Sequence, residues 1–511
     1  MTLWYDVSDL TNWSLPHLTG IQRTTVGILD GLVRIGAAPR LVAWNTDIGG
    51  FAPLEAIALP ETIRQHLPWA AGTVAGLEIG LADCGPPAPN DAKATVQATV
   101  QAPVQATAES WPAAPRRRSV RDAIFGTSPD AAVLRTAFRE FKVAGRQFRR
   151  QLARWSQARV REALGRDAGR PPEAPTPLGF GPPSAAFVAT AHEPRPRATA
   201  RGPFRSGDML VSVGASWAIA AHAEATAALR PQGVRVVRMI YDLISTLRPQ
   251  WVDETATRLL TAWAQRVLTD SDHVLTISEF SRREIDRYCA AAGLVAPPLS
   301  VVRLGDVLPA FSGNPPPPRT VPERPFFLCV SNLDIRKNHR LLYDTWSVLA
   351  ARSPDRCPDL VCVGLPNPYT GDLVRELTRD PSLRDRIHLL HGVDDTELAW
   401  YYRSCVATIY ASRYEGWGLP VAESLGHGRL CLASNATSIP EISPDLPVYF
   451  DPYDQPGLVA LVERSLGDPE WVRDREAEIR RRFAPTPWTH TASQVLAAAM
   501  GAFKPSDSRA A

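Results

Sequence analysis

The sequence predicts an α/β protein with two domains, each built around a mainly parallel sheet, and two observations carry that prediction. Short apolar runs alternate with segments that can form helices, first near the N-terminus and again from residue 208. This alternation is typical of parallel strands covered by helices on both faces. A proline-rich run at residues 314–325, NPPPPRTVPERP, separates two such series. Stiff, extended runs of this kind act as spacers, so we place the domain boundary there.

The composition supports a folded chain with a sizeable core. The 511 residues are 45% hydrophobic and 21% charged, with a formal net charge of +3. These values exclude a wholly disordered or fibrous protein and provide no overall basic field for nucleic acid. No run of 18 apolar residues is present, so we expect no membrane-spanning helix. The N-terminus lacks the pattern of a signal peptide, which predicts a cytoplasmic location.

The seven cysteines are interpreted as buried, reduced side chains. They form no CxxC pair, and their number is odd. Cys357 and Cys362 are the closest pair, and no cluster of His or Cys lies near them in the sequence to complete a zinc site. Cysteines in apolar runs behave as small hydrophobic residues, and a reducing compartment keeps them free.

The chain divides into four predicted parts and a linker. The first α/β domain comprises residues 1–82 and 205–313, and the second comprises residues 326–485, with a C-terminal helix at about 486–504 packing back on the first. Strands are expected in the first domain at residues 3–7, 41–44, 209–213, 234–240, 273–277 and 300–302. In the second domain they are expected at residues 326–330, 360–363, 387–390, 407–410, 430–433 and 448–450.

Residues 83–204 form a Pro-, Ala- and Arg-rich insertion. Part of it reads ATVQ-ATVQ-APVQ and lacks large apolar residues, so we expect that part to be disordered. Residues 131–164 have aromatic and apolar side chains at helical spacing, and the segment from Arg116 to Arg170 holds fifteen basic and five acidic residues. Such a basic amphipathic helix can lie on an anionic membrane, or it can pack on its own protein with a solvated arginine face. The pattern leaves both open.

The segment YASRYEGWGLPVAE, Tyr410–Glu423, carries the densest chemical signal. A predicted strand ends at Tyr410, two glycines free the backbone, and Leu419 with the following proline can open a helix. Backbone amides at such a helix start attract phosphate. Glu415 and Glu423 flank this turn, and their carboxylates suit the hydroxyl groups of a sugar or ribose. The alternative is two exposed glutamates on an ordinary strand–turn–helix.

Two further segments follow predicted strands. SNLDIRKNH, residues 331–339, contains Arg336 and Lys337, and Lys337 is one of only four lysines in the chain. A compact ammonium group suits a phosphate, although a solvated charge pair would have the same sequence. In TGIQR, residues 19–23, Gly20 lies between the first strand and its helix and would allow close approach to a diphosphate. A plain helix-capping region is the alternative.

Together these segments resemble the retaining glycosyltransferases of family 4. Glu415 to Glu423 matches the Glu-x7-Glu motif of that family, and the agreement covers about 350 residues without the insertion. The other segments that carry it are DVSDL (6–10), TGIQR, MIYDL (239–243), HVLTISEFSRREI (273–285), VVRLGD (301–306), SNLDIRKNH, HGVDDTEL (391–398) and HGRLCLAS (427–434). The resemblance implies the GT-B fold, in which two Rossmann-like domains face each other across a cleft.

The resemblance also implies a site for a nucleotide sugar. Glu423 would hold the ribose hydroxyls, and Glu415 would contact the donor sugar. The diphosphate would meet Arg336, Lys337, the amides around Gly418 and Leu419, and Gly20 from the first domain, while Val393 would line the base. Transfer would retain the anomeric configuration and need neither a cofactor nor a metal.

The first domain departs from the family at one point. Many members have His-Asp where this chain has Tyr241 and Asp242. Asp242 can still accept a hydrogen bond from an acceptor hydroxyl, although a helix or turn cap is an equal alternative. The sequence Asp270–Ser271–Asp272 matches a metal-binding Asp-x-Asp pattern, but it ends a helix rather than following a strand, and we expect no metal there.

We therefore expect a hexosyltransferase of exopolysaccharide or O-antigen biosynthesis. Its donor would be a nucleotide sugar, with GDP-mannose as the first expectation, and its acceptor a saccharide or a polyprenyl-linked oligosaccharide. Location would be cytoplasmic, and peripheral on the inner membrane face if the basic segment binds anionic lipid. The alternatives are a GT-B sugar-nucleotide epimerase or phosphorylase and, from another class, a non-catalytic membrane-associated scaffold.

Overall fold

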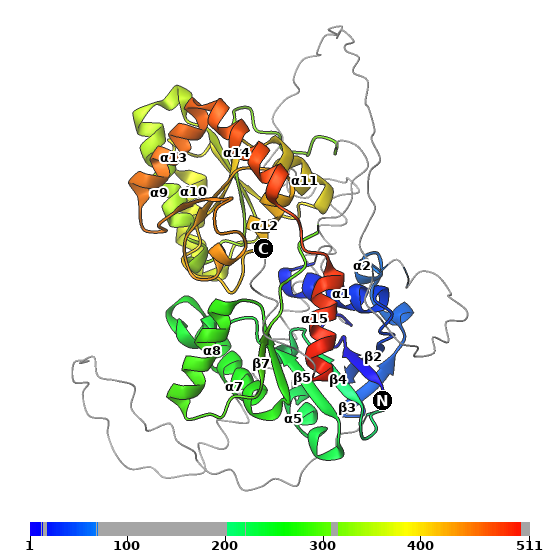
Figure 1. The fold of residues 1–511 in the computed structure, drawn as a ribbon. Helices are drawn as coiled ribbons and strands as arrows, with labels where there is room; N and C mark the ends of the chain where they lie inside the picture. Colours follow the sequence, from blue (N-terminus) through cyan, green and yellow to red (C-terminus); the bar gives the residue numbers. More distant parts are fainter. Residues whose placement is uncertain are drawn as a thin grey trace, which may run out of the picture. The chain divides into compact units, whose positions relative to one another are not determined.

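The computed structural model describes residues 1–11, 13, 18–67, 69, 202–219, 221–307 and 315–501 (Figure 1). The predicted helix at 131–164, the ATVQ repeat and nearly all of the insertion lie outside these residues. Within the linker, residues 315–325 carry no helix or strand. Among the described helices, none combines the length and the apolar character needed to cross a bilayer.

The first domain is built on a seven-stranded sheet with the order β3-β2-β1-β4-β5-β6-β7. Its strands are β1 (Leu3–Asp6), β2 (Arg40–Asn45), β3 (Gly50–Leu54), β4 (Met209–Ser212), β5 (Arg235–Met239), β6 (His273–Thr276) and β7 (Leu299–Val301). All neighbouring pairs except β2 and β3 are parallel. The parallel sheet predicted from the apolar runs is therefore confirmed in this domain.

The edge strand β3 was not predicted from the sequence. It runs antiparallel to β2, with Trp44 opposite Phe51 and Val42 opposite Pro53. Only four residues separate the two strands, and a connection this short permits a hairpin but no parallel crossover. Pro53 is compatible with this position because an edge strand leaves one row of backbone amides unused.

Helices cover both faces of this sheet. They are α1 (Gly20–Arg34), α2 (Glu61–Arg64), α5 (His222–Ala227), α6 (Ile244–Leu247), α7 (Glu254–Asp270) and α8 (Glu279–Ala292). Side chains cap α7 and α8: Asp253 accepts a hydrogen bond from the Ala256 amide, and Ser278 accepts one from the Ser281 amide. Each cap satisfies a backbone donor that a helix start leaves unpaired.

The second domain has a six-stranded, wholly parallel sheet with the order β10-β9-β8-β11-β12-β13. Its strands are β8 (Phe326–Val330), β9 (Asp359–Val363), β10 (Ile387–Leu390), β11 (Ala407–Tyr410), β12 (Cys431–Ser434) and β13 (Val448–Phe450). Its helices are α9 (His339–Arg352), α10 (Gly371–Arg379), α11 (Asp395–Ser404), α12 (Leu419–Gly426), α13 (Gln455–Gly467) and α14 (Pro469–Arg482). These strands begin and end within one residue of the predicted ranges.

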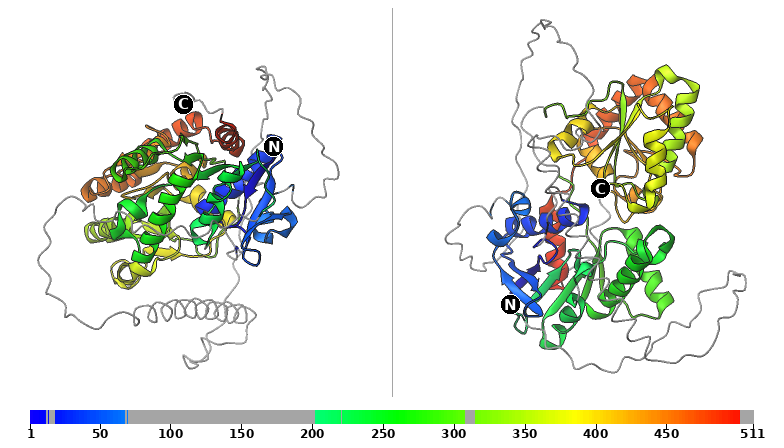
Figure 2. Two further views of the ribbon diagram at one scale, coloured as in Figure 1. Left: turned by 90° about the horizontal axis from the view of Figure 1, so that it is seen from below. Right: turned by 180° about the vertical axis from the view of Figure 1, so that it is seen from behind.

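The C-terminal helix α15 (Trp488–Met500) packs beside α1 of the first domain (Figures 1 and 2). Two glycines of α1 make this possible. A Cβ atom on Gly27 would lie 2.3 Å from the Trp488 ring, and one on Gly31 would lie 2.5 Å from the Trp488 carbonyl oxygen. The chain therefore enters the second domain through the linker and returns to the first through α15.

Candidate functional site

Two loops at the carboxyl ends of neighbouring strands build the centre of the site. The loop after β8 contains a 3-10 turn, Ile335–Lys337, whose start is capped by Asp334: its carboxylate accepts a hydrogen bond from the Arg336 amide at 3.1 Å. The loop after β11 lies beside it, because the Arg413 amide donates to the Arg336 carbonyl at 2.8 Å. Strands β8 and β11 are paired in the sheet, so their ends carry both loops to one edge.

Glu415 joins the two loops through its carboxylate. Arg336 Nη1 lies 2.5 Å from Glu415 Oε2, and Lys337 Nζ lies 2.5 Å from Oε1. The Tyr410 hydroxyl donates to Oε1 at 2.9 Å. Glu415 is only 6% exposed, so these ion pairs are largely shielded from water.

These contacts determine the protonation of the cluster. Burial alone would raise the pKa of Glu415, but the charges of Arg336 and Lys337 outweigh it and lower that pKa to about 2. Burial and the adjacent Arg336 lower the pKa of Lys337, although Glu415 opposes that shift. Glu415, Arg336 and Lys337 together carry one net positive charge, and the nearby carboxylates of Asp242 and Asp334 also interact with Arg336.

A turn after β12 holds the backbone of Glu415. The Glu415 amide donates to Thr437 Oγ1 at 2.9 Å, and the hydroxyls of Thr437 and Ser438 donate to the Glu415 carbonyl at 3.0 and 2.8 Å. Thr437 has φ +55°, a conformation that is rare for a β-branched residue and marks a constrained turn. Sequence reasoning missed Thr437 and Ser438, since nothing near Glu415 in the chain points to them.

Gly416 and Gly418 shape the start of α12. A Cβ on Gly416 would lie 3.0 Å from Asp242 Oδ2 and 3.1 Å from the Tyr241 carbonyl oxygen, so this glycine allows a close approach. Gly418 has φ +148° and precedes Leu419, the first residue of α12. In the first turn of α12, Pro420 has no amide hydrogen and the Val421 amide donates to the Gly418 carbonyl at 2.9 Å, so the Leu419 amide is the donor left without a partner inside the helix.

Glu423 lies in α12 and is 7% exposed. Arg23, on α1, donates from Nη1 to Glu423 Oε1 at 2.7 Å, and the Tyr402 hydroxyl donates to Oε2 at 2.9 Å. Arg23 also pairs with Asp395 at 3.2 Å. Contacts of Arg23, Tyr402 and Asp395 with this site were not predicted. Arg23 belongs to the TGIQR segment, and that segment was the feature of the sequence that could have indicated its role.

A small cavity of about 140 Å³ adjoins this pair. Its lining combines apolar residues with the charged or polar side chains of Arg23, Asp30, His66, Asp306, Asp395 and Glu423. Gly20 opens α1 nearby, where a Cβ would lie 3.8 Å from Leu419 Cδ1, so the space itself does not require glycine. Val393 follows β10 and packs against the apolar cluster around Tyr401 and Tyr402.

Asp242 lies half-buried in the loop after β5. Its Oδ1 accepts a hydrogen bond from the Ile244 amide at 3.0 Å, so Asp242 caps the turn that follows β5. Burial raises the pKa of Asp242, and Arg336 partly opposes the shift. The Tyr241 hydroxyl donates to the Val213 carbonyl at 2.8 Å, so Tyr241 supports the loop after β4.

Glu284 is a further acidic residue near this loop that sequence reasoning missed. It lies on α8, is 7% exposed and accepts a hydrogen bond from the Tyr414 hydroxyl. Burial raises the pKa of Glu284, and the charge of Asp242 adds to that shift. Arg248 lies 5.2 Å from the centre of the Tyr414 ring, so acidic, basic and aromatic groups meet beside Glu415.

The Asp-x-Asp segment forms local contacts. Asp270 ends α7, and Asp272 accepts hydrogen bonds from Arg230 Nε at 2.9 Å and from the Val236 amide at 2.8 Å. These contacts occupy both Asp272 oxygens in joining α7 to β5.

No cluster of His or Cys lies near Cys362 along the chain, but the fold brings two such residues beside it in space. Its partner across the sheet is Cys329, and His339 lies beside them, so the three side chains bring their ligand atoms within 4.8 Å of one another. Sheet register creates this cluster, since Cys329 and Cys362 stand on different strands. The positions of these residues along the chain do not indicate that they form a cluster.

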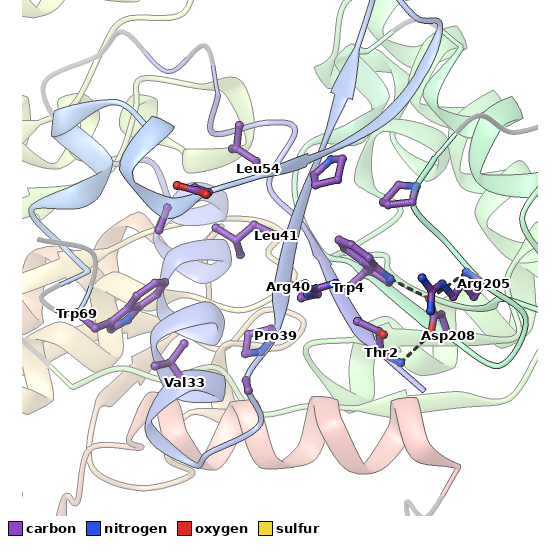
Figure 3. Close-up of a pocket in the computed structure, with 15 residues that line it drawn as sticks. Thr2, Trp4, Val33, Pro39, Arg40, Leu41, Leu54, Trp69, Arg205 and Asp208 are labelled. Atoms are coloured by element: carbon purple, nitrogen blue, oxygen red, sulfur yellow. Dashed lines mark hydrogen bonds between the residues drawn. The ribbon is translucent and has the colours of Figure 1, made fainter. Parts of the chain in front are cut away.

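A larger cavity of about 830 Å³ lies at the opposite end of the first sheet (Figure 3). Trp4 and Asp208 line it, and the Trp4 indole donates to Asp208 Oδ2 at 3.1 Å. Arg40 begins β2 and lies 5.7 Å from the centre of the Trp4 ring. The cavity therefore opens at the amino ends of these strands and is separate from the site around Glu415.

A family model and several curated proteins are similar to parts of this chain. Residues 314–483 match the family model described as glycosyl transferases group 1. The O-antigen chain mannosyltransferase B of Escherichia coli is 26% identical over 267 residues, which are 51% of this chain and 69% of that protein. The serotype-specific mannosyltransferase WbdA of Escherichia coli is 28% identical over 168 residues. That match covers 33% of this chain but only 20% of WbdA.

Among solved structures, sucrose-phosphate synthase from Thermosynechococcus elongatus is similar with a TM-score of 0.43 and 22% identity. The match covers 56% of this chain and 71% of that one. The residues that match the glycosyl transferases group 1 model, 314–483, include Glu415, Glu423, Arg336 and Lys337.

Proposed function

Given this similarity to glycosyl transferases group 1, we propose that the protein is a retaining hexosyltransferase that moves mannose from GDP-mannose to a saccharide or polyprenyl-linked acceptor in polysaccharide biosynthesis. The observation that carries the proposal is the buried cluster of Glu415, Arg336 and Lys337 beside the start of α12. The names of the two mannosyltransferase relatives support the choice of sugar and pathway.

In this proposal the second domain binds the donor. Arg336, Lys337 and the amides around Gly418 and Leu419 hold the diphosphate, because cations and a helix start both favour anions. Glu415 accepts hydrogen bonds from hydroxyls of the sugar. Glu423 accepts those of the ribose once Arg23 moves off its carboxylate.

Transfer then proceeds on one face of the sugar. The acceptor oxygen forms a bond to the anomeric carbon on the side from which the diphosphate oxygen leaves, and the acceptor proton passes to the departing phosphate. Asp242 orients the acceptor hydroxyl. Arg336 and Lys337 stabilise the negative charge that develops on the leaving group, which is electrostatic catalysis by groups already in place.

A transfer assay tests the proposal directly. The protein is incubated with radiolabelled GDP-mannose, with and without a polyprenyl-linked oligosaccharide, and the products are separated by chromatography. We expect label in the lipid-linked product only, with an α-anomeric proton in its NMR spectrum. Free sugar or an isomerised donor without acceptor would favour a phosphorylase or an epimerase, and no turnover of any donor would favour a scaffold.

Replacing Lys337 by alanine is expected to weaken donor binding by about 1.5–3 kcal/mol, the range for a hydrogen bond to a charged group. Arg336 still pairs with Glu415 in this variant, so the fold should persist. Calorimetry with GDP-mannose measures the effect. Arg340→Ala serves as the control, because Arg340 pairs with Glu376 at the surface. Equal affinity of wild type and Lys337→Ala would remove Lys337 from the donor site.

Brief treatment with excess EDTA is expected to leave transfer activity unchanged. Two cations and the helix start supply the positive charge that a divalent metal would otherwise bring to the diphosphate. Initial rates before and after chelation provide the measurement. A loss of activity that manganese restores would contradict the proposal and make Asp270 and Asp272 candidate ligands.

We also propose that the basic segment from Arg116 to Arg170 places the enzyme on an anionic membrane surface. Deleting it is expected to abolish co-sedimentation with vesicles that contain phosphatidylglycerol, since basic side chains supply the attraction. Vesicles made of phosphatidylcholine alone, which carry no net charge, serve as the control for electrostatic binding. Sedimentation of the deleted protein with the anionic vesicles would show that another surface binds lipid.

A further inference from the structure

Three potential metal ligands converge in the core of the second domain, at the two ends of the loop that carries Arg336 and Lys337. Cys329 is in β8 and Cys362 is in β9, and they face each other in register across the two parallel strands. His339 is the first residue of α9. Each of the three is 1% exposed.

The distances among Cys329, His339 and Ser331 are close to those between the ligands of a tetrahedral ion. Cys329 Sγ lies 3.8 Å from His339 Nε2, and the Ser331 hydroxyl lies 3.5 Å from Nε2 and 3.8 Å from Cys329 Sγ. All ligand atoms of the two cysteines and the histidine lie within 4.8 Å of one another. Tetrahedral zinc, with bonds of about 2.3 Å to sulfur and about 2.0 Å to nitrogen, separates its ligands by roughly 3.3–3.8 Å.

We propose that Cys329, Cys362 and His339 bind one zinc ion, with the Ser331 hydroxyl or a water molecule as the fourth ligand. Both thiols lose their protons to solvent on binding, and the imidazole binds in its neutral form. Two thiolates balance the charge of Zn²⁺, so the complex is neutral overall. Neutrality matters here because an uncompensated charge in a buried site is costly.

Sulfur and imidazole ligands also select the metal. Thiolates favour zinc over calcium, magnesium and manganese, which prefer oxygen ligands. Ser331 is partly exposed, whereas the other three side chains are buried. The Ser331 side is therefore the route by which an ion would enter, and a chelator in solution would reach the site slowly.

The position of the cluster gives the ion a structural role. Cys329 precedes the loop that carries Arg336 and Lys337, and His339 follows it. A metal bound to both ends would clamp the loop that holds the two cations against Glu415. The ion would lie outside the reaction itself, so rapid EDTA treatment and a structural zinc site are compatible.

The test uses the full chain, purified under reducing and oxygen-free conditions. Elemental mass spectrometry should find about one zinc per chain. Cobalt added to protein freed of zinc should produce the visible absorption of a tetrahedral site and the near-ultraviolet band of thiolate ligation. Cys329→Ala, Cys362→Ala and His339→Gln should each lose most of the bound metal. Cys357→Ala and Cys405→Ala should keep it, because these buried cysteines of the same domain lie outside the cluster.

A second measurement, on the wild-type protein, keeps the proposal testable if the variants fail to fold. Zinc added to the metal-free wild-type protein should raise its melting temperature, since a ligand that binds only the native state stabilises it. An unchanged melting temperature together with zinc-free purified protein would overturn the proposal. So would equal zinc in the cluster variants and the controls, or a Cys329–Cys362 disulfide found by peptide mass spectrometry. None of these results depends on transfer activity, so failure here is distinguishable from failure of the proposed function.

Discussion

Replacing Glu415 by glutamine is expected to produce the largest loss of both stability and activity. Glutamine keeps the shape of the side chain but removes the charge that Arg336 and Lys337 share. Two cations would then remain in a buried site without their anion, at a cost of about 3–5 kcal/mol. Urea unfolding followed by circular dichroism measures this loss. Transfer should fall by about 100-fold, because misplaced binding groups reduce rates by that order.

The control for this variant is Glu463→Gln. Glu463 pairs with Arg352 at the surface, where both side chains are well exposed, and a surface substitution of this kind changes stability by about 0.5 kcal/mol or less. If Glu415→Gln were as stable and as active as Glu463→Gln, the cluster would have no role in either property.

Lowering the pH should remove the stabilisation that ionised Glu415 provides in the wild-type protein. The ordinary pKa of a glutamate is 4.5, and that of Glu415 in the folded protein is lowered to about 2. Its ionised form therefore stabilises the fold above the ordinary pKa, and this stabilisation is lost as the pH falls from about 5 towards 2. The difference corresponds to an order of 3 kcal/mol. The gap in unfolding free energy between wild type and Glu415→Gln should narrow across that range.

Replacing Gly364 by alanine is expected to destabilise the second domain by about 3 kcal/mol. Gly364 follows β9 with φ +158°, and a Cβ there would lie 2.2 Å from the Ser331 carbonyl oxygen. That oxygen belongs to the backbone and cannot rotate away, so the strands or the Ser331 loop must shift. The same shift would move Arg336 and Lys337, and donor affinity should fall together with stability. Denaturant unfolding and calorimetry with GDP-mannose measure the two effects.

Gly371→Ala is the matched control. Gly371 opens α10 in the same domain with φ −58°, and nothing lies within 4 Å of a Cβ placed there. Alanine favours helix over glycine, so this variant should be as stable as wild type or up to about 1 kcal/mol more stable. Equal behaviour of Gly364→Ala and Gly371→Ala would show that the Ser331 loop adapts without cost.

The fold was predictable where a short local pattern decides it. Buried parallel strands are continuous apolar runs, so β8, β10, β11 and β13 were expected over the residues that form them. β3 was missed, because its alternating Gly50–Leu54 segment pairs as a hairpin at an edge and carries no strong apolar run.

The same limit holds for the site. Arg336 with Lys337 and Glu415 each follow a predicted strand, and the sequence alone pointed to both loops. Their pairing within 2.5 Å depends on the neighbouring positions of β8 and β11 in the sheet. The spacing of residues along the chain does not indicate that β8 and β11 are neighbours in the sheet.

By itself, therefore, the sequence determined two parallel-sheet domains, the loops that carry charge and the family that the second domain resembles. Only the tertiary structure decided which side chains meet. Arg23 reaches Glu423 across 400 residues, and sheet register places Cys329 against Cys362. The spacing of apolar residues along the chain indicates which face of a helix or strand is buried, because each residue's hydrophobicity reflects its own exposure to water. Contacts between distant segments depend on strand order and register, which arise only when the whole chain packs.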